Sequence, residues 1–311
     1  MIYTVTLNPT LDITYVLEEI SYDESVKALE VVKTPGGKGV NVSRVLKAMG
    51  TDSVTMALIG GFAGAEALDL LHREGLILQI VRIEANTRTN VIVLGRRNGL
   101  ELVIRAAGPP VEDREIDRIS DLIMQTTRVP EMIVLSGSLP RGVDNDAYYR
   151  LAMEGKSRGA KVILDSGGKP LRAGIKAAPL LIKPNLAELE ELAGCELEGR
   201  RQILDFCGDL LLGGIEIVVV SLGREGAMLV TGDVALKGTV PFIDDDTVGA
   251  GDSMVAGMVM GLTRSLPMEE VFHMGLACSV ATVINTGPGL TTRETYAEAF
   301  PQIGIEQISM V

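Results

Sequence analysis

The chain has 311 residues, of which 46% are hydrophobic, and a formal net charge of -12. A chain of this size can bury a large core, either as one α/β domain or as a domain with a small appendage. The acidic balance, without any run of Lys and Arg, argues against a nucleic-acid or anionic-membrane surface, so anions must be bound by local, preorganised groups.

The few cysteines and histidines exclude several other classes of protein. Cys195, Cys207 and Cys278 contain no C-x-x-C pair, so we expect buried thiols in a reducing compartment and neither a disulfide framework nor a zinc site. The first residues, MIYTVTLNP, lack the basic and apolar regions of a signal peptide, and no run of 18 apolar residues occurs. We therefore expect a cytoplasmic protein. His72 and His273, both in helical patterns, leave little material for a histidine-based mechanism.

Apolar, β-rich runs alternate with helical patterns along the chain. Strands are predicted at 2–7, 53–60, 132–137, 161–166, 180–184 and 215–223, and helices at 39–49, 63–74, 113–126, 144–158, 185–193 and 198–213. This alternation predicts an α/β fold with a doubly wound, mostly parallel sheet flanked by helices. Continuously apolar runs such as VVVSLG fit strands that are covered on both faces.

Two segments, 12–33 and 87–105, break the alternation with half-polar strand patterns. The second contains Asn98 and Gly99, a strong hairpin signal. We expect a small β-sheet that projects from a single domain spanning 1–311. An exposed sheet edge invites aggregation unless it is paired, so a homodimer through this small sheet is expected.

The stretch VGAGDS, followed by apolar residues with helical spacing, predicts a helix that begins at two glycines and a carboxylate. Gly249, Ala250 and Gly251 would lie at the helix N-terminus, where free N–H groups and the helix dipole favour an anion. Asp252 in the first turn would repel a bound phosphate, yet it suits a base that deprotonates a hydroxyl attacking a phosphoryl group. The alternative is an ordinary acidic residue that stabilises the helix start.

Two earlier motifs also combine glycine or turn residues with polar side chains. In PGGKGVN, Gly37 allows the backbone to approach a ligand, and Lys38 and Asn41 offer polar contacts; the alternative is a tight turn before a helix. TLNPTLD places Asp12 beyond the carboxyl end of the first strand. Ligands bind at that edge of open α/β sheets, so this carboxylate can hold two sugar hydroxyls.

Two later motifs fit the nucleotide side of such a site. IKPNLAEL places Asn185 and Glu188 on one face of a starting helix, which suits Mg²⁺ bound directly or through water. The alternative is a capping box formed by the same two residues. SLGREGA follows an apolar strand and is either a nucleotide-side loop or a plain turn.

Seven motifs in order resemble the phosphofructokinase group of the ribokinase-like (PfkB-type) carbohydrate kinases over nearly the whole chain. They are TLNPTLD, PGGKGVNVSRVLK, TRTN, SGSLPRG, IKPNLAEL, SLGREGA and TVGAGDSMVAG. The resemblance implies a large α/β domain with a β-sheet lid that often forms the dimer contact. It also implies ATP and Mg²⁺, used to phosphorylate a sugar phosphate.

The resemblance also implies roles for individual residues. Asp252 matches the catalytic base, and Gly249, Ala250 and Gly251 match the anion hole. The positions that match sugar-phosphate contacts are Asp12, Gly37, Lys38, Asn41, Arg88 and Ser138. The positions assigned to ATP are Lys183, Asn185, Ser221, Gly223, Gly226 and Gly251, and the pair assigned to Mg²⁺ is Asn185 and Glu188. Lys27 and Arg105 align with lid residues of the family only after a shift, which on a strand reverses the face, so they stay unassigned.

Three acceptors compete within this group: fructose 1-phosphate, tagatose 6-phosphate and fructose 6-phosphate. PGGKGVNVSRVLK, TRTN and TVGAGDSMVAG most resemble fructose-1-phosphate kinases, so that acceptor is the prediction. A non-catalytic sugar- or nucleotide-binding protein is the alternative from another class, and the presence of Asp252 and of the pair Asn185 and Glu188 disfavours it. A nicotinamide-dependent dehydrogenase would need a G-x-G-x-x-G fingerprint, which the chain lacks.

Overall fold

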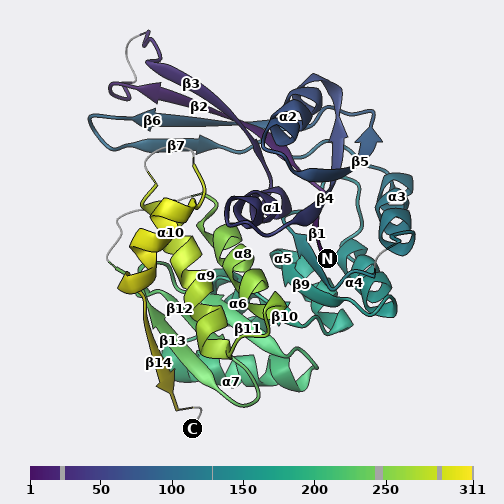
Figure 1. Ribbon diagram of the computed structural model, residues 1–311, viewed down its shortest axis with the longest axis vertical. Helices are drawn as coiled ribbons and strands as arrows, with labels where there is room; N and C mark the ends of the chain where they lie inside the picture. The colour runs from purple at the N-terminus through teal and green to yellow at the C-terminus, as the bar shows by residue number, and fades with distance from the viewer. Residues whose placement is uncertain (22–24, 128, 242–247, 286–288, 310–311) are drawn as a thin grey trace.

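The computed structural model describes residues 1–21, 25–127, 129–241, 248–285 and 289–309. Thr247, the first residue of the motif TVGAGDSMVAG, lies outside them. Two sheets organise the described chain: a large sheet enclosed by helices and a small sheet that extends from one side of it (Figure 1).

The large sheet is mostly parallel, which confirms the predicted fold class. In spatial order its strands are β14 (Gly304–Ile308), β13 (Ala235–Thr239), β12 (Ala227–Val230), β11 (Ile217–Ser221), β10 (Leu181–Ile182), β9 (Lys161–Asp165), β8 (Met132–Ser136), β1 (Ile2–Thr6), β4 (Ser53–Gly60) and β5 (Ile77–Ile83). The strands from β5 to β11 pair in parallel, whereas β12, β13 and β14 continue the sheet antiparallel.

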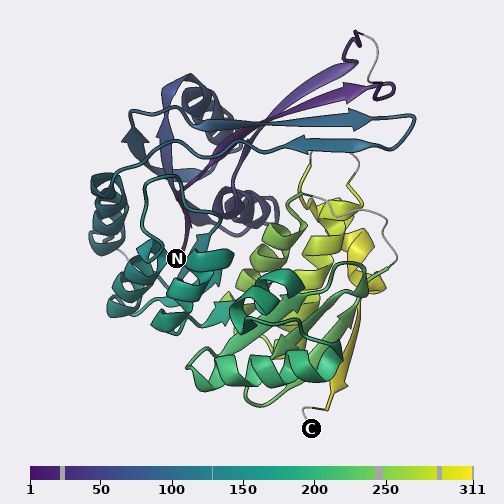
Figure 2. The same ribbon diagram turned by 180° about the vertical axis from the view of Figure 1, so that it is seen from behind.

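Helices cover both faces of the large sheet, as a doubly wound fold requires (Figures 1 and 2). They are α1 (Lys38–Ala48), α2 (Gly61–Arg73), α3 (Asp113–Met124), α4 (Ala147–Ser157), α5 (Gly168–Gly174), α6 (Leu186–Ala193), α7 (Gly199–Leu212), α8 (Ala250–Thr263), α9 (Met268–Val283) and α10 (Arg293–Ala299), with short 3-10 turns at Ile175–Ala177, Gly223–Glu225 and Phe300–Gln302. None of the helices in the described ranges is long and apolar enough to cross a bilayer.

Neighbouring strand residues point into two separate cores. Tyr3 and Val5 of β1 pack with α3 to α7, whereas Ile2 packs with α1, α8 and α9 on the other face. Side chains alternate across a strand, so a strand buried on both faces must be apolar at successive positions. The continuous apolar runs of the sequence follow from this double burial.

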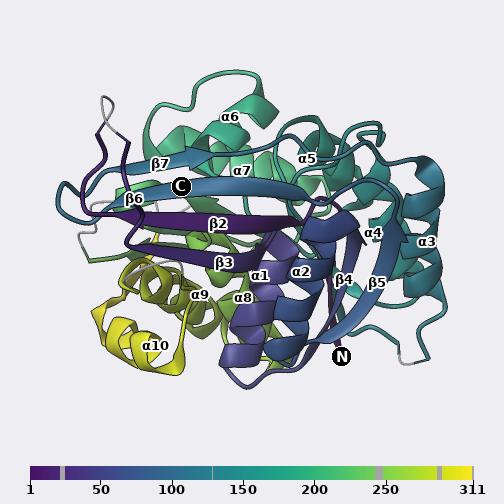
Figure 3. The same cartoon turned by 90° about the horizontal axis from the view of Figure 1, so that it is seen from above.

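The small sheet, called the lid sheet here, has the order β3 (Glu30–Gly36), β2 (Thr10–Leu17), β6 (Arg88–Gly95) and β7 (Glu101–Ile104). The predicted hairpin is present, because β6 and β7 pair antiparallel around a turn in which Gly99 has φ 64°. Seen from above, the lid sheet runs across the molecule, with α8, α9 and α10 below it (Figure 3). Thr10 pairs with both Gly36 and Arg88, so the ends of three lid strands meet at its base.

Candidate active site

A cleft of about 1040 Å³ separates the base of the lid sheet from the carboxyl ends of the central strands and the start of α8. Every site residue predicted from the sequence lines it: Asp12, Gly37, Lys38, Asn41, Arg88, Ser138, Lys183, Asn185, Glu188, Ser221, Gly223, Gly226, Gly249, Ala250, Gly251 and Asp252. Arg105, left unassigned, also lines the cleft, whereas Lys27, His72 and His273 do not. Segments far apart in the sequence therefore form one site.

The start of α8 is built around Gly249. This residue is the N-cap and has φ 94°, in the left-handed region that favours glycine. A Cβ there would also lie 2.5 Å from a methyl carbon of Leu290. The backbone can therefore turn sharply into the helix, which exposes the first N–H groups of α8 to the cleft.

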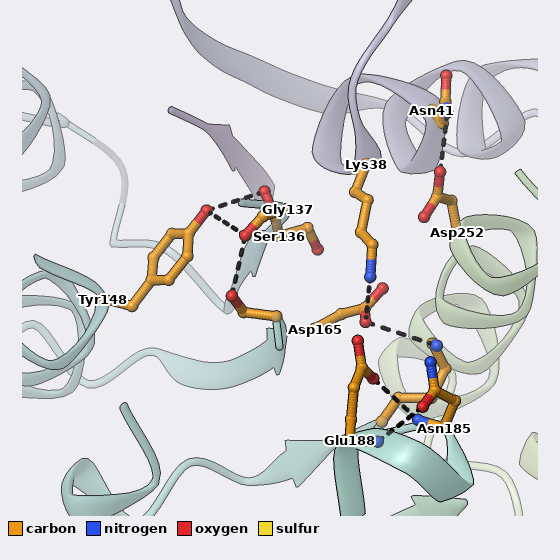
Figure 4. Close-up of polar contacts among 11 residues, drawn as sticks. Lys38, Asn41, Ser136, Gly137, Tyr148, Asp165, Asn185, Glu188 and Asp252 are labelled. Atoms are coloured by element: carbon orange, nitrogen blue, oxygen red, sulfur yellow. Dashed lines mark hydrogen bonds and ion pairs between the residues drawn. The ribbon is translucent and has the colours of Figure 1, made fainter. Parts of the chain in front are cut away.

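Asp252 lies in the first turn of α8 and is 6% exposed. Its Oδ2 accepts a hydrogen bond of 2.8 Å from the Asn41 amide on α1 (Figure 4). Burial raises the pKa of Asp252 to about 6, although Lys38 and the Asn41 hydrogen bond act in the opposite direction. A carboxyl group with this pKa is ionised near neutral pH and still binds a proton readily, which suits a general base. Asn41, predicted as a sugar-phosphate contact, thus also binds the predicted base.

Asp165, at the end of β9, is a site residue that the sequence analysis did not single out. It is fully buried, and its Oδ1 lies 3.0 Å from Lys38 Nζ and 3.5 Å from Lys183 Nζ. Burial acts to raise the pKa of Asp165, but Lys183 and Lys38 outweigh burial and hold the pKa below its ordinary value. A carboxylate at the carboxyl end of the predicted strand 161–166 was the available signal, because ligands gather at that edge.

The lid end of the cleft contains a third carboxylate, which is half-buried. Asp12 accepts hydrogen bonds from Asn90 at 2.8 Å and from Thr10 at 3.1 Å through Oδ1. Burial raises the pKa of Asp12 in spite of these bonds. Arg88 donates to the carbonyl groups of Asn8 and Ala106, so part of its guanidinium already serves the base of the lid sheet.

Asn185 and Glu188 form the capping box that was the structural alternative. Asn185 is the N-cap of α6, with its Oδ1 accepting from the Glu188 N–H at 2.8 Å, while Glu188 Oε2 accepts from the Asn185 N–H at 2.9 Å. The box leaves Glu188 Oε1 beside Gly167 at the cleft. Among the described residues, no group of three or more His, Cys, Asp or Glu side chains could hold a metal ion by itself. The donor set fits Mg²⁺ that keeps waters and phosphate ligands.

The motif SLGREGA forms the connection between β11 and β12. Gly223 and Gly226 have φ 58° and 86°, and Ser221 pairs with Asn185 across a short bridge. These residues border a part of the cleft lined by apolar side chains, among them Val240, Leu276, Val280 and Val283. Apart from Arg224, this part of the cleft is thus mainly apolar, whereas the part at the lid sheet carries Asp12, Arg88 and Arg105.

Comparison with known proteins first gives the class, which is that of sugar kinases. The chain belongs to the pfkB family of carbohydrate kinases, which matches residues 5–295. Two curated relatives are both named 1-phosphofructokinase. That of Borreliella burgdorferi is 34% identical over 286 residues, 91% of this chain and 92% of the relative, and that of Bacillus subtilis is 32% identical over 99% of this chain and all of the relative. A crystal structure of phosphofructokinase-2 from Escherichia coli with potassium is 29% identical, with a TM-score of 0.90 over 96% of this chain and 98% of that one.

Proposed function

We propose that this protein transfers the γ-phosphoryl group of ATP to the free primary hydroxyl of fructose 1-phosphate, giving fructose 1,6-bisphosphate and ADP. The observation that carries the proposal is the buried Asp252 carboxylate beside the glycine-lined start of α8. The names of the two curated relatives favour fructose 1-phosphate over tagatose 6-phosphate and fructose 6-phosphate.

The proposed general base is Asp252. Asn41 engages its Oδ2, which fixes the carboxylate and directs Oδ1 to the acceptor. The acceptor hydroxyl gives its proton to this carboxylate while its oxygen bonds to the γ-phosphorus and the bond to the leaving ADP oxygen breaks. This is in-line transfer, in which the protein contributes mainly position and charge.

The proposed anion hole consists of the first backbone N–H groups of α8 at Gly249, Ala250 and Gly251. They are aimed at the place where negative charge develops on the transferred group. Lys183 Nζ lies beside the proposed anion hole, because a Cβ built on Gly251 would be 3.1 Å from this nitrogen. The absence of side chains at the two glycines gives the phosphoryl group room to approach.

The proposed acceptor site is the charged end of the cleft at the lid sheet. The Asp12 carboxylate suits two sugar hydroxyls, with Gly37, Lys38, Asn41 and Ser138 as the further contacts that the family resemblance implies. Burial lowers the pKa of Arg88, and the positive charge of the nearby Arg105 lowers it further. Two guanidinium groups so placed suit the phosphate that the acceptor already carries.

The proposed nucleotide site is the opposite end of the cleft. Its apolar lining suits a purine ring, and Lys183, Asn185, Ser221, Gly223 and Gly226 border the path of the phosphates. Asn185 and Glu188 would hold Mg²⁺ with water and phosphate oxygens. When bound, Mg²⁺ would supply positive charge that neutralises the phosphates.

We also propose a cytoplasmic homodimer joined through the lid sheet. By strand register, one face of this sheet, opposite to Asp12, carries seven apolar or aromatic residues, Ile13, Tyr15, Val31, Val91, Val93, Leu102 and Ile104, and also Lys33, which is paired with Glu66. Val31, Leu102 and Ile104 are 49%, 46% and 55% exposed, which is unfavourable for a lone apolar face in water. All three cysteines lie among the described residues and are unpaired; Cys207 and Cys278 are buried as expected, whereas Cys195 is exposed, so the expectation of a buried thiol was wrong for that residue.

The test is an ADP-release assay with Mg-ATP that compares the three acceptors by kcat/KM. Fructose 1-phosphate should give the highest value, and Asp252→Asn should lower kcat by roughly 10² to 10⁴, the usual contribution of a general base. Near-normal turnover in this variant would remove Asp252 from the mechanism, and a preference for another acceptor would overturn the substrate assignment.

The control for Asp252→Asn is a measurement of its thermal stability and of its ATP binding. Burial raises the pKa of Asp252 to about 6 in the folded state, so the protonated form favours folding; this stability is present at low pH and is lost as pH rises through about 6, where the buried charge destabilises the fold. Asp252→Asn should therefore keep or raise Tm near neutral pH and still bind ATP in calorimetry. A lower Tm would attribute the lost activity to misfolding.

A further inference from the structure

Asp165 joins two lysines that come from separate parts of the fold. Lys38, the first residue of α1, approaches an Asp165 carboxylate oxygen (Figure 4). Lys183, which follows β10, approaches the same oxygen with its ammonium group. The Asp165 side chain is fully buried and that of Lys183 is 6% exposed. The Lys38 side chain is 37% exposed, so water screens part of its charge, and the buried carboxylate compensates the repulsion that remains between the two ammonium groups.

The two lysines keep donors for the cleft. A Lys ammonium has three N–H donors, and Asp165 takes one from Lys38 in the 3.0 Å hydrogen bond. Both lysines line the cleft, Lys183 beside Gly251 and Lys38 within the electrostatic reach of Asp252 and Glu188. Their remaining donors are therefore available where α8 begins.

Asp165 itself is not fully satisfied by protein groups. Its Oδ2 is buried and accepts no hydrogen bond from the described residues. A buried carboxylate that only stabilised the fold would be expected to have both oxygens paired, because an unpaired buried acceptor costs free energy. Burial acts to lower the pKa of Lys38, but Asp165, Asp252 and Glu188 outweigh it and raise the pKa, which keeps Lys38 charged.

We propose that Asp165 is a positioning residue that draws the ammonium groups of Lys38 and Lys183 together, so that they flank the phosphoryl group during its transfer. The inference rests on the proposed kinase function and assigns Asp165 a part in it without contact to the reacting atoms. Asp165 would stabilise the transition state through the two lysines, whose charges oppose the charge on the transferred group.

The test is a double-mutant cycle of Asp165→Asn and Lys183→Met, with kcat and KM measured for the preferred acceptor. Each single change should lower kcat by about 10² with less than about 3-fold change in acceptor KM, as expected for loss of one electrostatic donor in the transition state. If Asp165 acts through Lys183, the double variant should keep at least about 10-fold more activity than the product of the single losses predicts.

Glu115→Gln is the matched control. Glu115 is another buried carboxylate, in the capping box of α3 and outside the cleft. This variant should lower Tm and leave kcat within about 2-fold of the wild type, as expected for a group remote from the site. The same pattern in Asp165→Asn, a lower Tm with normal kcat, would reduce Asp165 to a structural residue.

The remaining outcomes are also decisive. Losses that multiply within about 3-fold overturn the inference, because independent effects are additive in free energy. Asp165→Asn alone leaves a positive charge uncompensated; if it fails to fold, the double variant, which loses one positive charge together with the negative one, is compared with Lys183→Met. A difference in kcat under about 10-fold between these two variants supports the inference, and a difference of about 10² or more overturns it. A wild-type protein inactive with all three acceptors refutes the proposed function, whereas an active wild type with an unimpaired Asp165→Asn refutes only the role of Asp165.

Discussion

At the scale of single residues, the site depends on buried carboxylates whose partners lie far away in the chain. The glycines and Asp252 were recognisable in the sequence, because they form one local motif and the other motifs in the chain favoured its functional interpretation over a plain helix start. The hydrogen bond from Asn41 to Asp252 and the contact of Lys38 with Asp165 were not recognisable, because these partners are 211 and 127 residues apart in the chain. Local spacing predicts the type of residue, and tertiary packing decides its partner.

The Asn41 hydrogen bond predicts a shift in the pH dependence. With a pKa of about 6 for Asp252, kcat/KM should fall as pH drops through that value, because the base becomes protonated. The Asn41 bond favours the ionised carboxylate, so Asn41→Ala should raise the pKa of Asp252 and move this acid limb to higher pH. The measurement is a pH profile of kcat/KM for both proteins with the same substrates, whose own titration then cancels.

Ser43→Ala is the control for that profile. Ser43 is buried in the same helix, but its hydroxyl bonds to Thr4 and Ser53 and not to the base. Its acid limb should match that of the wild type. An unshifted limb in Asn41→Ala would separate Asn41 from the proton transfer.

At the scale of elements, the alternation of periods predicted the central strands and the helices between them to within a few residues. It did not predict β5, α5, α9, α10 or the antiparallel strands β12, β13 and β14. The helix α9 is buried and apolar along most of its length, so it lacks a clear polar face, and direction within a sheet depends on pairing partners that no local pattern specifies. The segment 12–33 was predicted as strands. It contributes to two strands, 10–17 and 30–36, which pair with each other, and the first of them also pairs with β6.

The start of α8 predicts a variant that separates activity from stability. Gly251 lies within the helix and does not have a positive φ, so alanine there is compatible with the backbone and favours helix formation. The added methyl group would face Lys183 Nζ at 3.1 Å in the proposed anion hole. Gly251→Ala should lower kcat by about 10-fold or more, as a misplaced transition-state donor does, without lowering Tm.

Gly208→Ala gives the comparison for this helix effect. Gly208 lies inside α7, and a Cβ there would meet nothing within 4 Å. Its Tm should rise with kcat unchanged, because alanine is favoured over glycine by about 1 kcal/mol in a helix interior. Normal kcat in Gly251→Ala would mean that the phosphoryl group does not pass this point of α8.

At the scale of the whole molecule, two sheets must meet for the site to exist. The sequence predicted both sheets and the edge of the large sheet that faces the ligand. It could not predict that Arg105 reaches the cleft while Lys27 does not, because that depends on where β7 and β3 lie relative to the large sheet. The lining of the cleft differs between its two ends: charged side chains lie towards the lid sheet, and mainly apolar side chains lie at the other end.

The exposed face of the lid sheet predicts the oligomeric state. Sedimentation should give twice the chain mass of 33.1 kDa, and Ile104→Lys should shift it to the monomer, because a desolvated charge opposes association at an apolar interface. Leu212→Lys changes a side chain that is 89% exposed at the end of α7 and should leave the mass unchanged. A monomeric wild type would exclude this interface.

A single residue, Gly37, connects the lid strand β3 to the helix α1. With φ 113° and the atoms of Thr6 and Pro9 close to where a Cβ would stand, it is a joint that other residues fit poorly. Asn41 lies within one helical turn of this residue and binds Asp252. We therefore expect the proposed acceptor site at the lid sheet and the proposed base to be coupled through the backbone at Gly37, so that a shift of β3 would also move the carboxylate.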